Sequence, residues 1–368
     1  MKNREQKRTW LHCNQRLADV IRAGIVLELA LLIAFGSLFF DYGKQTLQTT
    51  GNAGNDYIKW VDFNVSYEAL CRAYEYDVDT HGGKIHLDWI ELLAYTATVN
   101  GGTFGSRSVS DMKKIAEKIL SGETTMEQAA ADMKYFSYYK EAYQAVLGGM
   151  VGEYEICAED GTTEKRYGLK AFSPIAKGFE YRDYDDFGVS RTYGFKREHL
   201  GHDMMGQVGT PVIAVESGTV EALGWNQYGG WRIGIRSHDK KRYYYYAHLR
   251  QNYPYQGNLE VGSEVTAGEV IGYMGHTGYS TKENVNNIDE VHLHFGMELI
   301  FDECQKDSNN EIWISCYNLT RFLSKNRAEV YKVEGTKEWK SRTQIREVEE
   351  TPVNPDTEAI NLCYRFNL

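Results

Sequence analysis

The chain has 368 residues, enough for two or three domains of ordinary size. Its hydrophobic fraction of 42% and charged fraction of 25% are typical of a globular protein. The formal net charge of −10 at pH 7 argues against non-specific nucleic-acid binding as the main task, so no nucleic-acid partner is expected. The six cysteines form no Cys-x-x-Cys pair, which argues against a cysteine zinc site.

The N-terminus predicts a membrane anchor. Residues 1–22 are basic, and residues 23–40 are almost wholly apolar, with Glu28 as the one charge. Eighteen helical residues span about 27 Å, close to the thickness of a bilayer core. No small-residue cleavage site follows the apolar run. We predict a single-pass signal anchor in the cell membrane, with the basic end in the cytoplasm and the rest of the chain outside. A buried soluble helix and a cleaved signal peptide are the alternatives.

The next segment predicts a linker and a small helical domain. Residues 41–64 are polar and rich in Thr, Gln, Gly and Asn, which favours a linker. Residues 65–155 contain several runs with apolar residues at helical spacing, which predicts an all-α domain. Residues 87–95 faintly resemble the helix that carries the catalytic glutamate of lytic transglycosylases, but the matching stretch 98–102 has no glutamate. We therefore expect a spacer or a docking surface for a protein partner, without glycosidase activity.

Residues 156–330 predict a β-rich domain. From about residue 195 to 302, short apolar and β-branched runs alternate with glycine turns, which is typical of an antiparallel β-sandwich or barrel. Residues 303–324 predict a covering strand and helix. The chain from about residue 325, including the charged C-terminal tail 331–368, predicts an extended or disordered appendage. The expected fold class is a multidomain α+β protein.

His292 and His294 are the first candidates for a functional site. They lie in a run, 290–299, that alternates polar and apolar residues, which is the pattern of a half-buried strand. Residues two apart on a strand point to the same face, so the two imidazoles project together. Such a pair suits a metal site, a proton-transfer site or both; two histidines on a solvated sheet face are the alternative.

Three short motifs follow one another along the chain: His199-Leu200-Gly201-His202-Asp203, Tyr246-Ala247-His248-Leu249 and His292-Leu293-His294-Phe295. Their order and fillers resemble the lysostaphin-type (LytM-domain) zinc metallopeptidases, which cut the peptide part of bacterial cell walls. The match covers about 100 residues, under a third of the chain. The resemblance implies that His199, Asp203 and His294 bind one Zn²⁺ per chain, and that His248 and His292 assist catalysis.

Zinc chemistry agrees with these roles. Zinc accepts histidine and carboxylate ligands, and a catalytic site keeps one position for water. The bound ion lowers the pKa of that water and polarises a peptide carbonyl. Two imidazoles outside the ligand set suit proton transfer and oxyanion stabilisation near neutral pH.

Four aromatic residues are candidate substrate contacts. On strand alternation, His248 shares a face with Tyr246 and Tyr244, which would place both tyrosines beside the substrate. Trp225 and Trp231 are candidates for a groove wall, with core packing as the alternative.

Two other histidines and one loop lie near the motifs. His202 is expected to point away from His199 and Asp203, and His276 to lie near the cleft. Residues 282–291 form a longer, acidic, Asn-rich loop where the family has a short turn, which predicts a reshaped groove or a role in substrate selection; a solvated surface insertion is the alternative.

The sequence therefore predicts a membrane-anchored zinc endopeptidase that hydrolyses peptide crosslinks of peptidoglycan. One alternative is a non-catalytic peptidoglycan-binding scaffold of a cell-envelope assembly, which would not need His248 and His292. The other is a metalloprotease that processes a protein substrate. The residues do not indicate which bond is cut.

Overall fold

The computed structural model describes residues 58–158, 161–193, 195–257, 259–306 and 310–348. The chain divides into two compact units, Met1–Trp60 and Val61–Leu368, and nearly all described residues belong to the second. The predicted anchor at residues 23–40 lies outside the described residues. Within the described ranges, every helix is too short or too polar to span a bilayer.

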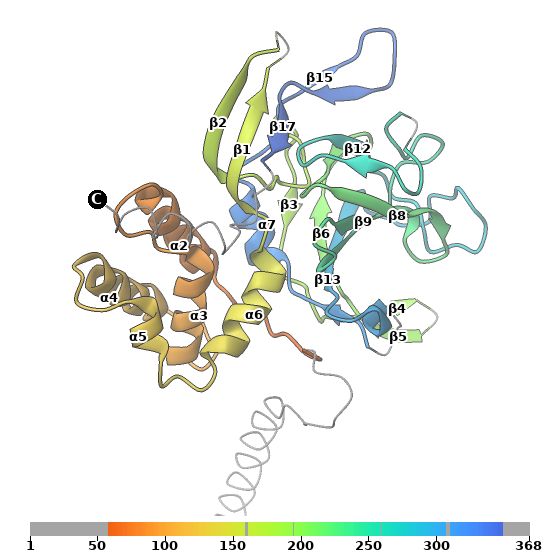
Figure 1. The fold of residues 1–368 in the computed structure, drawn as a ribbon. Coiled ribbons are helices and arrows are strands. Elements are labelled where there is room, and N and C mark those ends of the chain that lie inside the picture. Colours follow the sequence, from red (N-terminus) through yellow and green to blue (C-terminus); the bar gives the residue numbers. More distant parts are fainter. Residues whose placement is uncertain (1–57, 159–160, 194, 258, 307–309, 349–368) are drawn as a thin grey trace, which may run out of the picture. The chain divides into compact units, whose positions relative to one another are not determined.

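Five helices form the first part of the second unit (Figure 1). They are α2 (Tyr67–Thr80), α3 (Trp89–Val99), α4 (Ser108–Leu120), α5 (Met126–Ala130) and α6 (Phe136–Leu147). Three of them begin where the sequence supplies a cap, since the side chains of Ser66, Asp88 and Thr125 each accept a hydrogen bond from the backbone N–H three residues on. The predicted helical region is therefore present, but residues 151–155 belong to a strand, β1 (Val151–Cys157).

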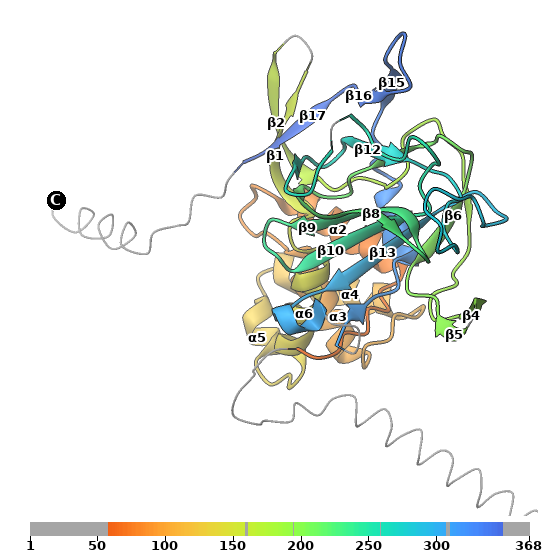
Figure 2. The same ribbon diagram turned by 90° about the vertical axis from the view of Figure 1, so that its right-hand side faces the viewer.

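A large antiparallel sheet of eight strands follows (Figure 2). Its strands lie in the order β11 (Glu264–Val265), β8 (Gly218–Asn226), β9 (Gly230–Ser237), β10 (Arg242–Ala247), β13 (His292–Leu299), β6 (His202–Met205) and β3 (Arg182–Asp183), with β14 (Ile312–Trp313) also paired to β13. A second antiparallel pair, β7 (Pro211–Ile213) and β12 (Val270–Tyr273), is joined to it through the N–H of Val215, which donates to Oη of Tyr246. The predicted antiparallel β architecture is confirmed.

Alternation along the central strands gives the large sheet two different faces. His294 pairs with Asp203 on one side and Ala247 on the other, so these three residues share a face. The neighbouring row, Phe295, His202 and Tyr246, faces the opposite way and is almost completely buried. The core thus lies on one face, and the site lies on the other.

Helices cover the core face of the sheet. The buried Arg242 of β10 donates through Nη1 to the carbonyl of Ala145 in α6, at 2.8 Å. His202 of β6 contacts Thr320 of α7 (Tyr317–Leu323), with Nδ1 2.8 Å from Oγ1. The helical region is therefore packed behind the sheet, away from the face that carries His294.

The C-terminal region is more ordered than its composition predicts. In place of the extended appendage expected from about residue 325, the structure has β15 (Val330–Lys332), β16 (Trp339–Ser341) and β17 (Gln344–Glu347). β17 pairs with β1, beside β2 (Thr163–Leu169), and its Ile345 is buried. The prediction was wrong because one buried residue and an available strand edge suffice to order a charged segment. Residues 349–368 lie outside the described residues.

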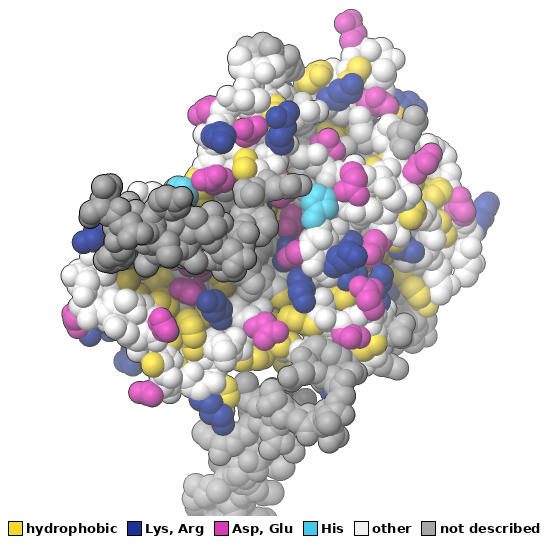
Figure 3. Space-filling view, viewed as in Figure 1, with side chains coloured by type: hydrophobic (Ala, Val, Ile, Leu, Met, Phe, Trp, Pro, Cys, Tyr) yellow, Lys and Arg dark blue, Asp and Glu magenta, His cyan; other side chains and the backbone are white. Residues whose placement is uncertain are grey.

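Charged side chains of both signs mix over the surface of the described residues. Figure 3 shows acidic and basic groups interspersed on the face seen in Figure 1. That face offers no continuous basic surface among the described residues, in line with the net charge.

Candidate active site

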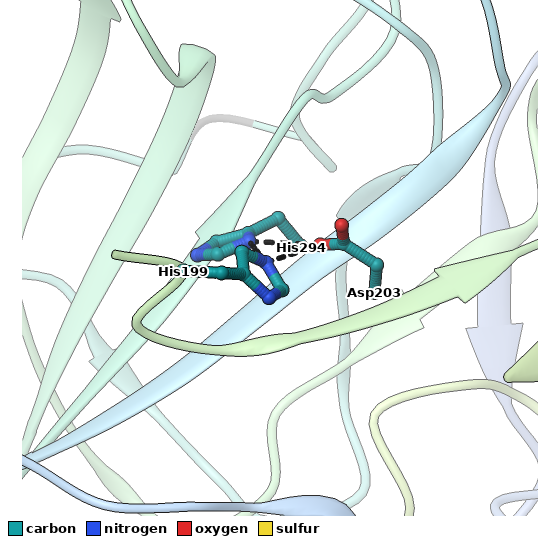
Figure 4. A group of neighbouring side chains, drawn as sticks. All are labelled: His199, Asp203 and His294. Carbon is teal, nitrogen blue, oxygen red and sulfur yellow. Dashed lines mark hydrogen bonds and ion pairs between the residues drawn. The ribbon is translucent and has the colours of Figure 1, made fainter. Parts of the chain in front are cut away.

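His199, Asp203 and His294 meet on the open face of the sheet (Figure 4). His199 precedes β6, Asp203 lies within it, and His294 lies on the adjacent strand β13. Nε2 of His199 lies 3.0 Å from Oδ1 of Asp203 and 3.0 Å from Nδ1 of His294, and the last two atoms are 2.9 Å apart. The structure thus brings together three potential ligand atoms from the first and third motifs.

Gly201 permits this close approach. A Cβ atom at position 201 would lie 2.6 Å from Cε1 of His294 and 2.8 Å from the carbonyl oxygen of Phe295. Any side chain there would displace the His294 ring, because contacts this short are not tolerated. The glycine in the first motif is therefore explained by contact with the third motif, and not by backbone conformation.

The surroundings of His199 determine which of its nitrogens faces the cluster. Its Nδ1 lies 3.1 Å from the carbonyl oxygen of Asp186, which can only accept a hydrogen bond. Nδ1 therefore carries a proton, and the Nε2 lone pair is free to point at Asp203 and His294. Arg191 binds the carboxylate of Asp186 and also approaches Oδ2 of Asp203, at 3.3 Å. Asp186 and Arg191 therefore help to orient the side chains of His199 and Asp203.

The surroundings of His199, Asp203 and His294 favour a positive charge among these three side chains. Burial alone would lower the pKa of His199, but hydrogen bonds with Asp186 and Asp203 outweigh it and raise the pKa to about 9. Burial opposes ionisation of Asp203 as well, yet His199 and His294 hold the pKa of its carboxyl well below the usual range. A cation bound among these three atoms would take the place of the proton that the raised pKa favours on His199.

His248 and His292 stand beside this cluster. Their ring centroids are 4.7 Å apart, and the ring of His248 lies 5.8 Å from that of His294. Nδ1 of His248 donates to the carbonyl of Thr277 at 2.9 Å, and Nδ1 of His292 donates to that of Glu290 at 2.9 Å. Each histidine therefore keeps a free Nε2 lone pair, and that of His292 lies 3.7 Å from Oδ1 of Asp203.

The environment of His248 favours its neutral form. Burial lowers its pKa well below the usual value, and the neighbouring His292 and His294 reinforce the effect. A neutral imidazole with an available lone pair is suited to accept a proton.

The expected contacts of Tyr244 and Tyr246 with a substrate are wrong. Both side chains are completely buried on the core face; the hydroxyl of Tyr244 donates to Glu216 at 2.6 Å. His248 has φ of +61°, in the left-handed region, so the alternation of β10 breaks there and the histidine turns to the opposite face from Tyr246. The tyrosines of β10 that line the cleft are instead Tyr243 and Tyr245.

A long cleft of about 1450 Å³ runs over the site face. Its lining includes all five motif residues and Tyr245, whose ring centroid lies 5.9 Å from that of His294. Trp225 and Trp231 do not line it. They pack edge to face across β8 and β9, and Nε1 of Trp231 donates to Asn284 at 2.9 Å, so they support the long loop and form no wall of this cleft.

His202 points away from the site as expected, whereas His276, expected near the cleft, does not line it. His202 is buried on the core face, and Nδ1 of His276 lies 2.7 Å from the carbonyl oxygen of Ile288, outside the cleft lining. Sequence reasoning missed Asp186 and Arg191, because neither belongs to a motif and only the fold brings them to His199.

Comparison with known families identifies the site-bearing segment. The model of peptidase family M23 matches residues 197–307, a segment that holds all three motifs. Residues 197–307 are a peptidase family M23 domain. The resemblance found in the sequence is confirmed for this domain, which covers under a third of the chain.

Relatives of the M23 domain include enzymes named for different bonds. An L-Ala–D-Glu endopeptidase of Bacillus subtilis is 38% identical over 124 residues, covering 34% of this chain and 36% of the relative. A glycyl-glycine endopeptidase of Staphylococcus capitis is 40% identical over 120 residues, covering 32% of this chain and 28% of the relative. The chain thus spans about a third of the length of these relatives.

Solved structures give a weaker likeness. A putative glycyl-glycine endopeptidase from Ruminococcus gnavus aligns with a TM-score of 0.49 at 24% identity, over 74% of this chain and 92% of that chain. The catalytic domain of lysostaphin from Staphylococcus simulans aligns with a TM-score of 0.30 at 29% identity, over 38% of this chain and 92% of that chain. Overall similarity at this level carries no argument about function.

Proposed function

We propose that the chain is a zinc-dependent endopeptidase that hydrolyses peptide crosslinks of peptidoglycan. One observation carries the proposal: three ligand atoms converge in a cleft beside two oriented histidines that are not ligands. The M23 domain and the names of its relatives support the choice of an endopeptidase acting on cell walls.

The donor set fits zinc. Zinc binds histidine nitrogen and carboxylate oxygen at about 2.0–2.2 Å, which separates tetrahedral ligands by about 3.3 Å. The separations of 2.9–3.0 Å among the atoms of His199, Asp203 and His294 need only a small expansion. These three residues would hold the ion, which supplies a Lewis acid for the carbonyl and lowers the pKa of a water ligand.

His248 and His292 would move the protons. Hydrolysis forms a bond from water oxygen to the carbonyl carbon and breaks the carbon–nitrogen bond. The free Nε2 of a neutral histidine accepts the proton of the attacking water and later delivers it to the departing amine nitrogen. The hydrogen bonds to Thr277 and Glu290 keep both rings in the required tautomer.

The two alternative functions make different demands on the site. A scaffold that only binds cell wall would not require two oriented imidazoles beside a metal cluster. A protease for a protein substrate would use the same groups as the proposed enzyme. Release of muropeptides from purified cell walls therefore separates the proposed function from both.

Membrane anchoring and an extracytoplasmic location are proposed from the sequence of residues 1–40. The measurement is the accessibility of the catalytic region to added protease in intact spheroplasts. Digestion supports the proposal, while protection until the cells are lysed overturns the location.

The activity test uses the full chain. Wild type should contain about one zinc ion and release muropeptides, and the His294→Ala variant should lose both. His238→Ala is the matched control, since His238 is exposed and its Nε2 lies 3.0 Å from Glu264, outside the cleft. Zinc binding without any muropeptide release would refute the proposed substrate.

A further inference from the structure

A second polar group occupies the floor of the same cleft. The sheet register aligns Glu298 of β13 with Tyr243 of β10 on one side and with Trp313 of β14 on the other. All three line the cleft. Glu298 is four residues beyond His294 on the same strand, which separates them by roughly 13 Å at about 3.3 Å per residue.

One oxygen of the Glu298 carboxyl lacks a hydrogen-bond partner among the described residues. That oxygen is Oε1, and the residue is only 5% exposed. Burying a polar group without a partner costs free energy, and native structures contain few such groups. An unpaired carboxyl oxygen in the floor of a binding cleft indicates a site for a donor from the ligand.

The nearby basic side chains are engaged by other acids. Arg236 donates to Glu303 at 3.0 Å, and Lys306 lies 3.2 Å from Glu221. Arg236 also lies 3.6 Å from Glu221, and Lys306 lies 3.6 Å from Glu303. Arg236 and Lys306 therefore offset the charge of Glu298 only in part, and Nη1 of Arg236, like Oε1 of Glu298, forms no hydrogen bond among the described residues. Arg232 also lines the cleft.

Glu311 adds a second negative group to this part of the cleft. It lies just before β14 and accepts a hydrogen bond from Nε1 of Trp313, at 2.8 Å. Burial and the nearby Glu311 raise the pKa of Glu298 to about 8, against the opposing influence of Arg236 and Lys306. An additional positive charge would therefore favour ionised Glu298.

The aromatic neighbours suit the same kind of ligand. The rings of Tyr243 and Trp313 lie over glycines: a Cβ on Gly234 would clash with the Tyr243 ring, and a Cβ on Gly296 would lie 2.7 Å from the Trp313 ring. The two glycines therefore leave room for these rings close to the sheet, on either side of Glu298. Aromatic faces beside a carboxylate attract an ammonium group.

We propose that Glu298 and Glu311, flanked by Tyr243 and Trp313, form a subsite that binds a primary ammonium group of the peptide substrate. The inference rests on the proposed function and deepens it. An extended peptide rises about 3.3 Å per residue and a lysine side chain reaches about 6 Å further, so the subsite takes the amine of a residue about two positions from the scissile bond. It selects substrates with a free amine at that distance.

The test is a binding measurement that does not depend on turnover. The full chain carrying His248→Ala is titrated calorimetrically with the tetrapeptide N-acetyl-L-Ala–γ-D-Glu–L-Lys–D-Ala, in which the lysine carries the one free amine, and with its Nε-acetyl derivative. The free amine should bind at least about tenfold more tightly. Adding Glu298→Gln, which keeps the side-chain shape, should bring the ratio of the two Kd values close to one.

A variant outside the cleft serves as the matched control. Glu264→Gln removes one negative charge outside the cleft lining and should leave the ratio unchanged. Equal binding of the two peptides before Glu298 is changed, no binding of either, or an unchanged ratio in the Glu298→Gln chain would each overturn the subsite. Muropeptide release by wild type is measured separately, so failure of the proposed function is distinguished from failure of the subsite.

Discussion

Nε2 of His199 and Nδ1 of His294 lie 3.0 Å apart, although the two residues are 95 positions apart in the chain. Both atoms also contact Oδ1 of Asp203. Three lone-pair atoms at such distances repel one another unless a proton or a cation lies among them. This relationship makes metal binding the first property to test.

Removing one member should abolish metal binding. We expect His294→Ala to lower zinc affinity by at least about a hundredfold, because only two ligands remain. Competition with a chromogenic chelator measures the affinity. His238→Ala should bind zinc as wild type does; unchanged affinity in His294→Ala would exclude this cluster as the zinc site.

Removing the neighbouring base should separate binding from catalysis. We expect His248→Ala to keep about one zinc per chain while muropeptide release falls about 10²–10⁴-fold, the usual contribution of a positioned acid–base group. Zinc content and release rate are measured on the same preparation. Loss of zinc together with activity would instead assign His248 a role in holding the metal.

Gly201 offers a steric test of the site. We expect Gly201→Ala to weaken zinc binding by about 10–100-fold, because the new methyl group displaces the ring of His294. Gly105→Ala is the control, since a Cβ there meets nothing within 4 Å. Equal zinc affinity in the two variants would show that His294 can shift without loss of its ligand role.

The buried ion pair between Glu216 and Arg242 links the sheet to the helical region. Arg242 donates to both oxygens of Glu216, at 2.7 and 2.9 Å, and to the carbonyl of Ala145. Glu216→Gln removes the buried counter-charge of the guanidinium and leaves it with Asp239, 2.9 Å away and about half exposed. The free energy of unfolding should therefore fall by about 3 kcal/mol in urea titration. Glu329→Gln, which breaks an exposed pair with Lys177, should cost less than about 1 kcal/mol.

The pKa of Glu298 predicts a pH dependence of stability. Its folded-state value of about 8 lies above the value of about 4.3 expected in the unfolded chain. Between these values the folded state binds a proton that the unfolded state lacks, so this group's contribution to stability falls as pH rises. Glu298→Gln lacks this penalty and should gain melting temperature relative to wild type from pH 5 to pH 8.5. A difference between the two melting temperatures that does not vary with pH would contradict the shift.

Local sequence patterns determined much of the fold and of the central site. Apolar residues at helical spacing correctly predict a helical region, and strand alternation correctly puts His292 and His294 on one face. The three motifs name all five residues that the structure brings together. These inferences succeed because they depend on the geometry of a few consecutive residues or on a motif whose spacing is characteristic.

The tertiary structure alone decided the walls and floor of the cleft. Because the backbone of His248 is left-handed, its side chain lies on the opposite face of the sheet from Tyr244 and Tyr246. The histidine therefore faces the cleft while the two tyrosines lie in the core. The row of Glu298, Tyr243 and Trp313 exists only through the register of three strands. Likewise, a charged tail becomes strand β17 because β1 offers it an edge. Such features depend on contacts between segments that are distant in the sequence. The free energy of these contacts depends on both segments, so it cannot be inferred from either one alone.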